Sequence, residues 1–398
     1  MQGFYLMVSF IVFFALNGCN KSEEVGIPSH LHCFNSKGNE IRMKDGGFLF
    51  TEGTGWNSQL TRFDKTGKII WTNDLSKKLI HAEAYYSILS ICETNEGGLA
   101  GFSLYQDTVY GFHFLKMFKV DQQGTMLWER LVNIFYSNYS YNFSPFINDG
   151  NDNFISTYFL YSNGLSSALI KIDSTGNLLL EQNTDLVSFS LLTLSSDNYL
   201  FGLGKEFFSG GNFLYKKDTG VAGTIQFQIP LLTNENVFNQ FYQTSILPAD
   251  DGGCIVSGYT NSGSNTFDFY VQKYSSSGTI EFIKKFGTIN HDYLSATIRT
   301  RNGGLLLVGT SSKNALNENQ IPDRTLDFNS RVYIVKLDAS FNLEWEKIIG
   351  GNFGSQGIDV NEDELRQVYI LGKQASHGND ALNQFFILQL KSDGSNDL

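Results

Sequence analysis

The stretch KVDQQGTMLWERL (Lys119–Leu131) contains the pattern that decides the fold, because close copies of it return along the chain. Three of these copies are RFDKTGKIIWTNDL (Arg62–Leu75), KIDSTGNLLLEQ (Lys171–Gln182) and KLDASFNLEWEKI (Lys336–Ile348). Each copy is a strand-like run ending in Lys-x-Asp or Arg-x-Asp, then a tight turn that usually contains Gly, and then a second strand-like run. A phrase that repeats at this scale predicts a fold built from copies of one supersecondary unit.

The second run of each copy has a large side chain four positions after the turn. The residues at this position are Trp71, Trp128, Leu180, Phe227, Phe282 and Trp345. Because side chains alternate between the two faces of a strand, a large residue fixed at one position always occupies the same face. We expect this side chain to pack against the neighbouring sheet.

A turn of the Asp-Gly-Gly kind alternates with the first pattern. Its copies are KDGGFLF (Lys44–Phe50), NEGGLAGF (Asn95–Phe102), NDNFIST (Asn151–Thr157), SDNYLFGLG (Ser196–Gly204), DGGCIVSG (Asp251–Gly258), NGGLLLVG (Asn302–Gly309) and a degenerate NEDELRQVYILG (Asn361–Gly372). Asp-Gly, Asn-Gly and Gly-Gly supply the positive φ angles that two-residue hairpin turns require. The neighbouring runs alternate between apolar and polar residues, as in SILSICET (Ser87–Thr94), which indicates half-buried strands.

The two patterns together define a unit of four antiparallel strands, A-turn-B-loop-C-turn-D, which recurs about every 50 residues and predicts a blade of a β-propeller. The chain has seven A–B turns, but its last C strand, QFFILQLKSDG (Gln384–Gly394), is followed by too few residues for a D strand. The missing strand is available in HLHCFNS (His30–Ser36), before the first A strand. The sequence therefore predicts an all-β fold: a seven-bladed β-propeller of four-stranded antiparallel blades, closed by an N-terminal strand that completes the last blade.

The pattern DGG…G…K-x-D-x-x-G-x-x-x-W, taken over His30–Gly394, resembles the propeller repeats of bacterial lipoproteins, especially those of the Bacteroidetes, and more distantly the quinoprotein-like propellers. The resemblance implies the fold and leaves the function open. DKTGKIIW (Asp64–Trp71) is similar to the Trp-docking phrase of pyrroloquinoline-quinone dehydrogenases. Those enzymes typically use eight blades, a vicinal Cys pair and a set of calcium ligands. This chain has no adjacent cysteines, so we interpret the phrase as blade packing and expect no cofactor.

The N-terminus has the features of a targeting signal. FYLMVSFIVFFAL (Phe4–Leu16) is an uncharged apolar run, shorter than the roughly 20 residues needed to span a bilayer and of the size of a signal-peptide core. It ends in LNGC (Leu16–Cys19), which resembles the lipobox of bacterial lipoproteins and implies that Cys19 becomes the acylated first residue of the mature chain. We interpret the polar segment NKSEEVGIPS (Asn20–Ser29) as a solvated tether.

These segments predict a lipoprotein signal peptide at 1–18, a tether at 19–29 and a single β-propeller domain at 30–398. The Lys-Ser-Glu-Glu cluster after Cys19 resembles the acidic surface-export signals of lipoproteins in the Bacteroidetes. The resemblance implies a lipid anchor in the outer membrane, with the cell surface as one orientation and the periplasm as the other.

The composition agrees with many short strands joined by tight turns, since the chain has 34 Phe, 19 Tyr and 39 Gly but only 5 Pro. A formal charge of −11 without any cluster of Lys and Arg argues against nucleic acid as a partner. Beyond Cys19, the cysteines Cys33, Cys92 and Cys254 are odd in number, lie in apolar runs and have no CxxC spacing. We therefore expect them to act as small hydrophobic residues rather than as disulfides or metal ligands.

Antiparallel four-stranded blades place the A–B and C–D turns on one rim and the B–C and D–A connections on the other. The first rim has only tight turns, whereas nearly all the length lies in the second. Its long connections are Tyr105–Gly111, Asn133–Pro145, Glu206–Asn212, Thr233–Tyr242, Ser311–Arg331 and Gln374–Asn383. Long loops on a rigid scaffold are where binding sites usually lie, so we expect any binding face on the second rim.

The candidate binding face on this rim is rich in aromatic side chains. It consists of Tyr105, Tyr136, Tyr139, Tyr141, Phe207, Phe208, Tyr242, Tyr259, Tyr293 and His377. Aromatic rings beside Asn, Gln and Asp suit the faces of sugars and also suit protein partners. The alternative for each ring is that it fills a gap between two blades.

Residues capable of metal or acid–base chemistry are sparse. His30 and His32 share one face of the closing strand, where a structural or solvated role is favoured over a zinc site. NDGNDN (Asn148–Asn153) resembles half of a calcium loop, lacks the distal Glu and is interpreted as an A–B turn. DRTLDFN (Asp323–Asn329) has two loop carboxylates whose separation nothing fixes. No Gly-x-Ser-x-Gly, His-Glu-x-x-His or phosphate loop occurs, so we expect no catalytic residue and no metal site.

Three functions remain open. The favoured one is a lipid-anchored, non-catalytic binding or scaffold module for a protein or glycan of the cell envelope, and it predicts no buried charged cluster in the central channel. The second is a periplasm-facing accessory of outer-membrane assembly, as in a non-enzymatic lipoprotein with quinoprotein-type repeats. The third is a glycan lyase or hydrolase, which needs ionisable side chains to converge near the channel mouth. The nearest candidates for that role are Asp107, His291, Asp327 and His377.

Overall fold

The structure is a computed structural model, and it describes a large part of the chain between residues 32 and 395. The described ranges are 32–35, 38–53, 58–74, 84–107, 112–136, 140–161, 165–184, 187–195, 197–206, 212–219, 225–231, 241–261, 265–314, 329–350, 354–374 and 384–395. The regular elements in these ranges are all β-strands, which confirms the all-β class. In the same ranges, no helical segment has the length and apolar character that crossing a membrane requires.

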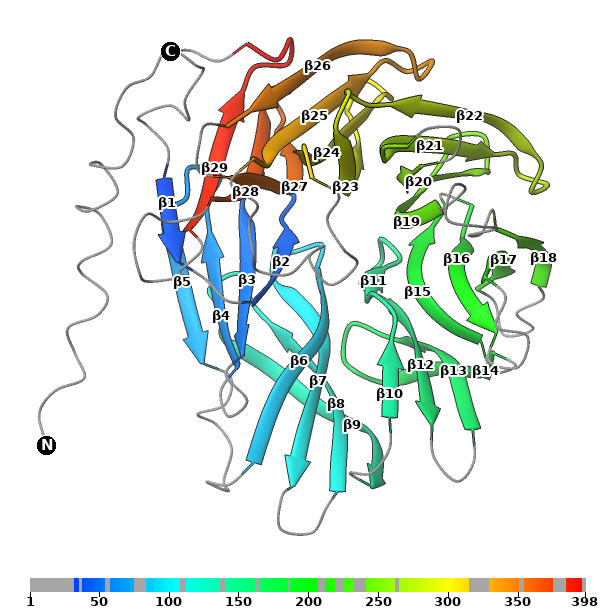
Figure 1. The fold of residues 1–398 in the computed structure, drawn as a ribbon. Helices are drawn as coiled ribbons and strands as arrows, with labels where there is room; N and C mark the ends of the chain where they lie inside the picture. The colour runs from blue at the N-terminus through cyan, green and yellow to red at the C-terminus, as the bar shows by residue number, and fades with distance from the viewer. Residues whose placement is uncertain are drawn as a thin grey trace, which may run out of the picture.

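The described strands form seven antiparallel sheets, called blades 1 to 7 (Figure 1). Blade 1 consists of β2 (Gly38–Arg42), β3 (Phe48–Gly53), β4 (Ser58–Phe63) and β5 (Ile69–Asp74). Blade 2 consists of β6 (Ala84–Glu93), β7 (Leu99–Asp107), β8 (Phe112–Val120) and β9 (Met126–Tyr136). Blade 3 consists of β10 (Ser140–Phe143), β11 (Ile147–Asn148), β12 (Phe154–Tyr161), β13 (Leu165–Ile172) and β14 (Leu178–Asn183).

Blades 4 to 7 continue the same order. Blade 4 consists of β15 (Val187–Leu194), β16 (Tyr199–Glu206), β17 (Asn212–Asp218) and β18 (Ile225–Pro230). Blade 5 consists of β19 (Phe241–Pro248), β20 (Cys254–Thr260), β21 (Asp268–Tyr274) and β22 (Ile280–Phe286). Blade 6 consists of β23 (His291–Arg299), β24 (Leu305–Ser312), β25 (Arg331–Leu337) and β26 (Leu343–Ile349). Blade 7 consists of β27 (Ser355–Glu362), β28 (Val368–Gln374), β29 (Gln384–Leu390) and the N-terminal β1 (His32–Asn35).

The seven-bladed propeller expected from the repeat is confirmed. Six sheets have four described strands each, and blade 3 has five because its A strand is broken into β10 and β11, which both pair with β12. The break falls at Ser144 and Pro145; Pro145 has no N–H to give to a ladder, and the Ser144 hydroxyl accepts a hydrogen bond from the Thr157 N–H at 2.8 Å instead.

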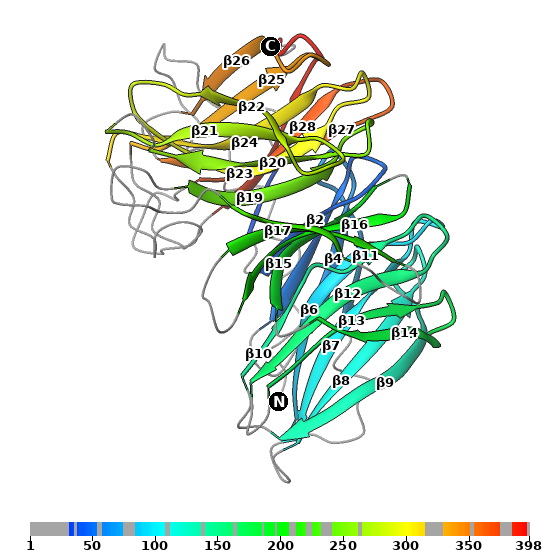
Figure 2. The same cartoon turned by 90° about the vertical axis from the view of Figure 1, so that its right-hand side faces the viewer.

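The closing strand is also confirmed. β1 pairs antiparallel with β29, with His32 opposite Ile387 and Asn35 opposite Gln384. Blade 1 and blade 7 lie side by side, blue beside red in Figure 1, while Figure 2 shows blades 2 and 3 at the opposite end of the molecule from blades 5 to 7. Each pair of successive blades is in contact, including blades 7 and 1 through β27 and β2, so the ring closes.

The large residue after each C–D turn docks on the next blade, as expected. The Trp128 indole N–H of blade 2 donates a hydrogen bond to the Ser174 carbonyl of blade 3 at 3.1 Å. In the C–D turn of blade 6, Phe341 takes the place of Gly with a φ of 60°, and its ring lies 5.2 Å from that of Phe282 in blade 5. The recurrent aromatic residue is therefore a link between neighbouring blades.

In some blades the basic residue that begins the Lys-x-Asp phrase is buried and reaches the next blade, as Lys216 and Lys336 show. The Lys336 ammonium, whose side chain is 1% exposed, donates to the Ser392 carbonyl of blade 7 at 2.6 Å. Lys216 donates to two turn carbonyls of blade 5, those of Gly252 at 3.0 Å and Ser276 at 3.2 Å. A buried cation is tolerated only when acceptors replace its water, so this Lys also fixes the position of the next blade.

In several blades, a Gly of the B strand faces a bulge in the A strand. The ladder between β19 and β20 shifts register between Gln243 and Ser245, and a Cβ at Gly258 would lie 1.7 Å from the Tyr242 carbonyl oxygen. In blade 6, a Cβ at Gly309 would lie 2.0 Å from the Tyr293 carbonyl oxygen. Any larger residue would collide with backbone, which explains why this Gly is part of the repeat.

The hydrophobic core is divided into clusters that lie between adjacent blades. One cluster combines Leu49 and Leu60 of blade 1 with Leu99 and Phe118 of blade 2. Another joins Phe50 of blade 1 to residues of blade 7, so the ring closure is also packed. Burial of apolar faces between blades is the main force that holds such a ring together.

Candidate functional site

The two rims of the propeller differ as the repeat predicts. The A–B turns lie within the described residues, as at Lys44–Gly47 and Arg301–Gly304, and we call their side the turn rim. The opposite side, the loop rim, carries the longer connections, such as that between β24 and β25. The predicted bounds of two loops are partly wrong. The predicted loop Tyr105–Gly111 begins inside β7, which continues to Asp107. The predicted loop Asn133–Pro145 overlaps β9, which continues to Tyr136, and β10, which starts at Ser140. Strand pairing in blades 2 and 3 therefore reaches further than the apolar alternation indicates.

Three residues of the predicted binding face come together between blades 5 and 6. The Tyr242 ring stacks on that of Tyr259 with centroids 4.8 Å apart, and Tyr259 meets Tyr293 edge-on at 5.3 Å. Phe267 and His291 complete this aromatic group, with the His291 ring 6.2 Å from Tyr293. Tyr259 is 8% exposed and Tyr293 2%, so these two rings pack between the blades rather than present a face to solvent.

The other residues of the predicted face are dispersed or lie beyond the described part. The half-buried Tyr105 ring of β7 lies 5.5 Å from Phe114 and beneath the ammonium of Lys116. For Tyr136 and Tyr141 the structure describes only the backbone, within β9 and β10. The positions of this face outside the described residues are Tyr139, Phe207, Phe208 and His377, and the predicted lipidation site Cys19 also lies outside them.

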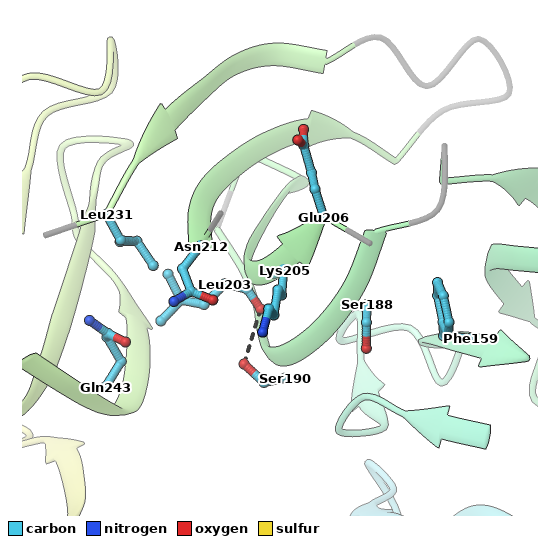
Figure 3. A pocket seen from close by; sticks show the side chains of 10 residues that line it. Phe159, Ser188, Ser190, Leu203, Lys205, Glu206, Asn212, Leu231 and Gln243 are labelled. Carbon is cyan, nitrogen blue, oxygen red and sulfur yellow. Dashed lines mark hydrogen bonds between the residues drawn. The ribbon is translucent and has the colours of Figure 1, made fainter. Parts of the chain in front are cut away.

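The described loop rim also has a feature that sequence reasoning missed, a cavity of about 530 Å³ at the end of blade 4. It is lined by Phe159, Ser188, Ser190, Leu203, Gly204, Lys205, Glu206, Asn212, Leu231 and Gln243 (Figure 3). Ser188 and Lys205 are opposite each other at the end of the β15–β16 ladder that is remote from the turn at Ser195–Asn198. The cavity therefore opens on the predicted rim, and the ends of the predicted Glu206–Asn212 connection contribute to it.

The polar groups of the cavity come from hydroxyl, amide, ammonium and carboxylate side chains. Ser190 occupies the bulge of β15, and its hydroxyl donates to the Leu203 carbonyl at 3.2 Å. Glu206 accepts hydrogen bonds from the Tyr215 hydroxyl and the Gln228 amide. Burial, and then the nearby Glu206 carboxylate, raise the pKa of Tyr215, so Tyr215 remains a donor.

A second cleft, of about 670 Å³, lies on the turn rim between blades 1 and 2. Several of its charged groups are already used in contacts within and between blades: Arg62 pairs with Asp45 at 2.7 Å, and the Glu93 carboxylate accepts the Lys44 N–H at 2.6 Å. These contacts hold turns together, so the loop-rim cavity is the better candidate for a ligand site.

The structure brings no metal set together in its described part, where no group of three His, Cys, Asp or Glu side chains could hold an ion. The NDGNDN segment is a turn, as interpreted: Asp149 accepts the N–H groups of Asn151 and Asn153 and pairs with Lys171 at 3.0 Å. Cys254 is buried and unpaired, and burial raises the pKa of its thiol. His30, the side chains of His32 and Cys33, and residues 323–328 lie outside what the structure describes.

A charged pair does lie on the innermost strands. Arg42 of β2 is 3.3 Å from Asp359 of β27, whose side chain is 13% exposed. Burial raises the pKa of the Asp359 carboxyl, and the Arg42 guanidinium opposes that shift. Arg42 also donates to the Thr297 carbonyl of blade 6 at 3.4 Å, so the pair helps to close the ring.

Of the residues proposed for an enzyme, His291 is the one whose side chain the structure describes. His291 is part of the aromatic group, and burial lowers its pKa despite the opposing charge of Asp268. Asp107 is described only as backbone at the end of β7, and Asp327 and His377 lie outside the described residues.

The sequence matches no protein-family model and no curated protein. Similar solved structures include prolyl oligopeptidase B from Galerina marginata bound to a 35mer substrate, with a TM-score of 0.52 and 10% identity. That alignment covers 92% of this chain and 49% of the other, so this chain spans about half the length of that peptidase.

Two further structures are similar at lower scores. A protein of unknown function from Dyadobacter fermentans has a TM-score of 0.41 and 11% identity, over 76% of this chain and 94% of its own. An apocarotenoid oxygenase mutant from Synechocystis has a TM-score of 0.45 and 12% identity, over 80% and 73%. The likeness to the peptidase, at 10% identity, supports the fold alone.

Proposed function

We propose that this protein is a lipid-anchored β-propeller of the bacterial cell envelope that binds a glycan, without catalysis, through the loop-rim cavity. The proposed anchor rests on the lipobox-like Leu16–Cys19 and the polar segment that follows it. The observation that carries the binding role is the cavity at the end of blade 4, on the rim where the repeat places its long connections.

The size of the cavity favours a small or narrow ligand. Ligand pockets commonly enclose about 300–1,000 Å³, and about 530 Å³ falls within that range. A stable protein partner instead buries about 1,200–2,000 Å² of surface, mostly across flatter faces. A glycan end fits a concave site of this kind better than a folded protein does.

The chemistry of the lining also suits a sugar. Ser188, Asn212 and Gln243 offer hydroxyl and amide groups that can both donate and accept, as sugar hydroxyls require. Leu203 and Leu231 offer apolar surface beside them, and Phe159 lines the far end. This mixture of directional polar groups and apolar contact is typical of small-molecule sites.

The number of carboxyl groups in the lining favours a binding role over glycoside hydrolysis. Glycoside hydrolases typically use two carboxyl groups about 5–10 Å apart. Among the described lining residues, Glu206 is the one carboxylate, and its oxygen is held by Tyr215 and Gln228. The described lining therefore lacks the second carboxyl group that glycoside hydrolysis needs.

The test is binding of the full-length chain, purified in detergent, to a glycan array. Asn212→Ala should weaken binding of the best glycan about fivefold to tenfold, because one or two hydrogen bonds are lost. Asn151→Ala, on the exposed turn rim, is the matched control and should leave binding unchanged. An array without any signal, or equal loss in both variants, would refute a glycan site here.

The alternatives are separated by three further measurements. A protein partner captured by the full chain, together with a blank array, would favour a scaffold or an assembly accessory. Turnover of a bound glycan would show an enzyme. Protease treatment of intact cells should cleave a surface-exposed protein and spare a periplasmic one, and Cys19→Ser should abolish fatty-acid labelling if the anchor is correct.

A further inference from the structure

The charged groups of the loop-rim cavity are unevenly placed. Lys205 and Glu206 are the charged residues among the described lining. Because they are consecutive in β16, their side chains leave opposite faces of the sheet, and Figure 3 shows them pointing in opposite directions. Each must therefore be considered with the neighbours on its own face.

Glu206 has its partners on its own face. The Tyr215 hydroxyl and the Gln228 amide both donate to its carboxylate, and these residues come from β17 and β18. The Glu206 charge is thus directed toward the outer strands of blade 4. It does not compensate the charge of Lys205 on the other face.

Lys205 has no ion-pair or hydrogen-bond partner within the described residues, and its side chain is exposed. Among the described residues of the lining, Lys205 is therefore a positive charge without a counter-charge on the face that meets blade 5. The basic residues Lys216 and Lys336 on the C strands are in a different situation, since they are buried against turn carbonyls. Lys205 is not used to hold the ring together.

The residues opposite Lys205 complete a row of polar groups. Ser188 lies directly across on β15, and Asn212 lies directly across on β17. Directly opposed residues in antiparallel strands point to the same face, with Cβ atoms about 4.5–5.5 Å apart. A hydroxyl, an ammonium and an amide therefore form one row at the cavity mouth, with Leu203 and Leu231 below it.

We infer that the cavity selects a sugar that bears a carboxylate, a uronic acid unit, with Lys205 as the group that binds the carboxylate. This inference rests on the proposed glycan-binding function and specifies its substrate class. The ammonium forms an ion pair with the carboxylate, and Ser188 and Asn212 bind the hydroxyls on the adjacent ring carbons. A neutral sugar would leave the Lys205 charge without a partner, and an anion without a ring would leave the apolar surface uncovered.

The experiment measures binding of tetragalacturonate, and of glucuronate- and mannuronate-containing tetrasaccharides, to the full-length chain by calorimetry. The matched ligand for each is its methyl ester, which has the same ring and hydroxyls without the charge. We expect the acid to bind at least about tenfold more tightly than its ester at low salt, and the difference to shrink as salt screens the exposed pair.

The protein variants isolate the ammonium. Lys205→Gln should abolish the preference for acid over ester, and Lys205→Arg should retain it. Lys313→Gln removes an exposed Lys from the start of the β24–β25 connection on the same rim, outside the cavity, and should leave the preference intact. Melting temperatures of all three variants should match the parent, since Lys205 is exposed.

The outcomes separate this inference from the function on which it rests. Equal affinity for acid and ester, or binding of neutral glycans alone, overturns the uronate inference and leaves glycan binding intact. Preference for a Glu-rich peptide over every acidic sugar overturns it in favour of a protein ligand. Absence of binding to any glycan overturns both.

Discussion

The indole of Trp71, on the outermost strand of blade 1, donates a hydrogen bond of 2.7 Å to the carbonyl of Gln122 in the C–D turn of blade 2. The same bond recurs from Trp128 to Ser174, and from Trp345 to Ser392 at 3.0 Å. These bonds join successive blades in one direction around the ring. The repeated Trp is therefore a structural link, in agreement with its interpretation as blade packing.

Replacing Trp71 should destabilise the ring at this link. Trp71→Leu removes a hydrogen bond and much of the ring contact, and because the side chain is only half-buried we expect a loss of about 2 kcal/mol in the free energy of unfolding. Ile69→Ala, on the same strand and 44% exposed, should lose less than about 1 kcal/mol. Urea denaturation measures both, and equal losses would show that the link adds no stability.

The Gly beneath this ring should be less replaceable than a Gly in an open turn. Gly124 has a φ of 78°, and a Cβ there would lie 2.7 Å from the Trp71 ring. Gly150 has a φ of 88° with nothing within 4 Å of its Cβ position. Gly150→Ala should lose about 1 kcal/mol from backbone strain, and Gly124→Ala about 1–3 kcal/mol more from overpacking.

A double variant separates the collision of the new Cβ with the Trp71 ring from the backbone strain at the positive φ of Gly124. In the presence of Trp71→Ala, the extra penalty of Gly124→Ala should disappear, so that the two losses are not additive. Additive losses would mean that the Trp ring moves aside without resistance.

Much of the fold is predictable from the sequence because its turns repeat. The Asp-Gly-Gly turns and the docking of Trp71 follow from patterns that recur along the chain. The closing strand at His32–Asn35 follows from the count of these turns, which leaves the last blade one strand short. The bulge opposite Gly258 is not predictable, since the Gly alone is compatible with a bulge, a bend or a close approach of another strand.

The candidate site is less predictable than the fold. Ser188, Lys205 and Asn212 become one row only when three strands pair in register, and each is an ordinary polar residue in its own segment. Tyr259 and Tyr293 are in the predicted region, but sequence alone does not tell a ring that faces solvent from one that fills the space between blades. The aromatic content of the segments therefore does not predict which residues line the cavity.

The N-terminal strand should be required for a monomeric ring. A chain that begins at residue 36 lacks β1 and leaves the backbone groups of β29 unpaired at a sheet edge. Exposed edges pair with other chains, so we expect a lower melting temperature and association into dimers or larger species. A chain that begins at residue 30 retains β1 and is the matched control. Calorimetry with size-exclusion chromatography measures both, and indistinguishable behaviour would show that β1 is dispensable.

The turn carboxylate of Asp173 should contribute stability that depends on pH. Its Oδ1 accepts the N–H groups of Thr175 at 2.9 Å and Asn177 at 2.8 Å. Burial alone would raise the pKa of Asp173, but the hydrogen bonds, led by that of the Asn177 N–H, outweigh it and lower the pKa to about 2. A carboxyl whose pKa is lower in the folded state stabilises the fold above its ordinary pKa, and that stability is lost as pH falls toward about 2.

Asp173→Asn keeps the shape of the side chain and removes its charge. Because the group is mostly exposed, solvent screening limits the effect, and we expect the variant to lose about 1 kcal/mol at pH 7. The difference between the variant and the parent should shrink between pH 4 and pH 2, where the parent carboxyl also becomes neutral. Urea denaturation at several pH values measures this, and a difference that stays constant down to pH 2 would mean that the charge of Asp173 does not hold the turn.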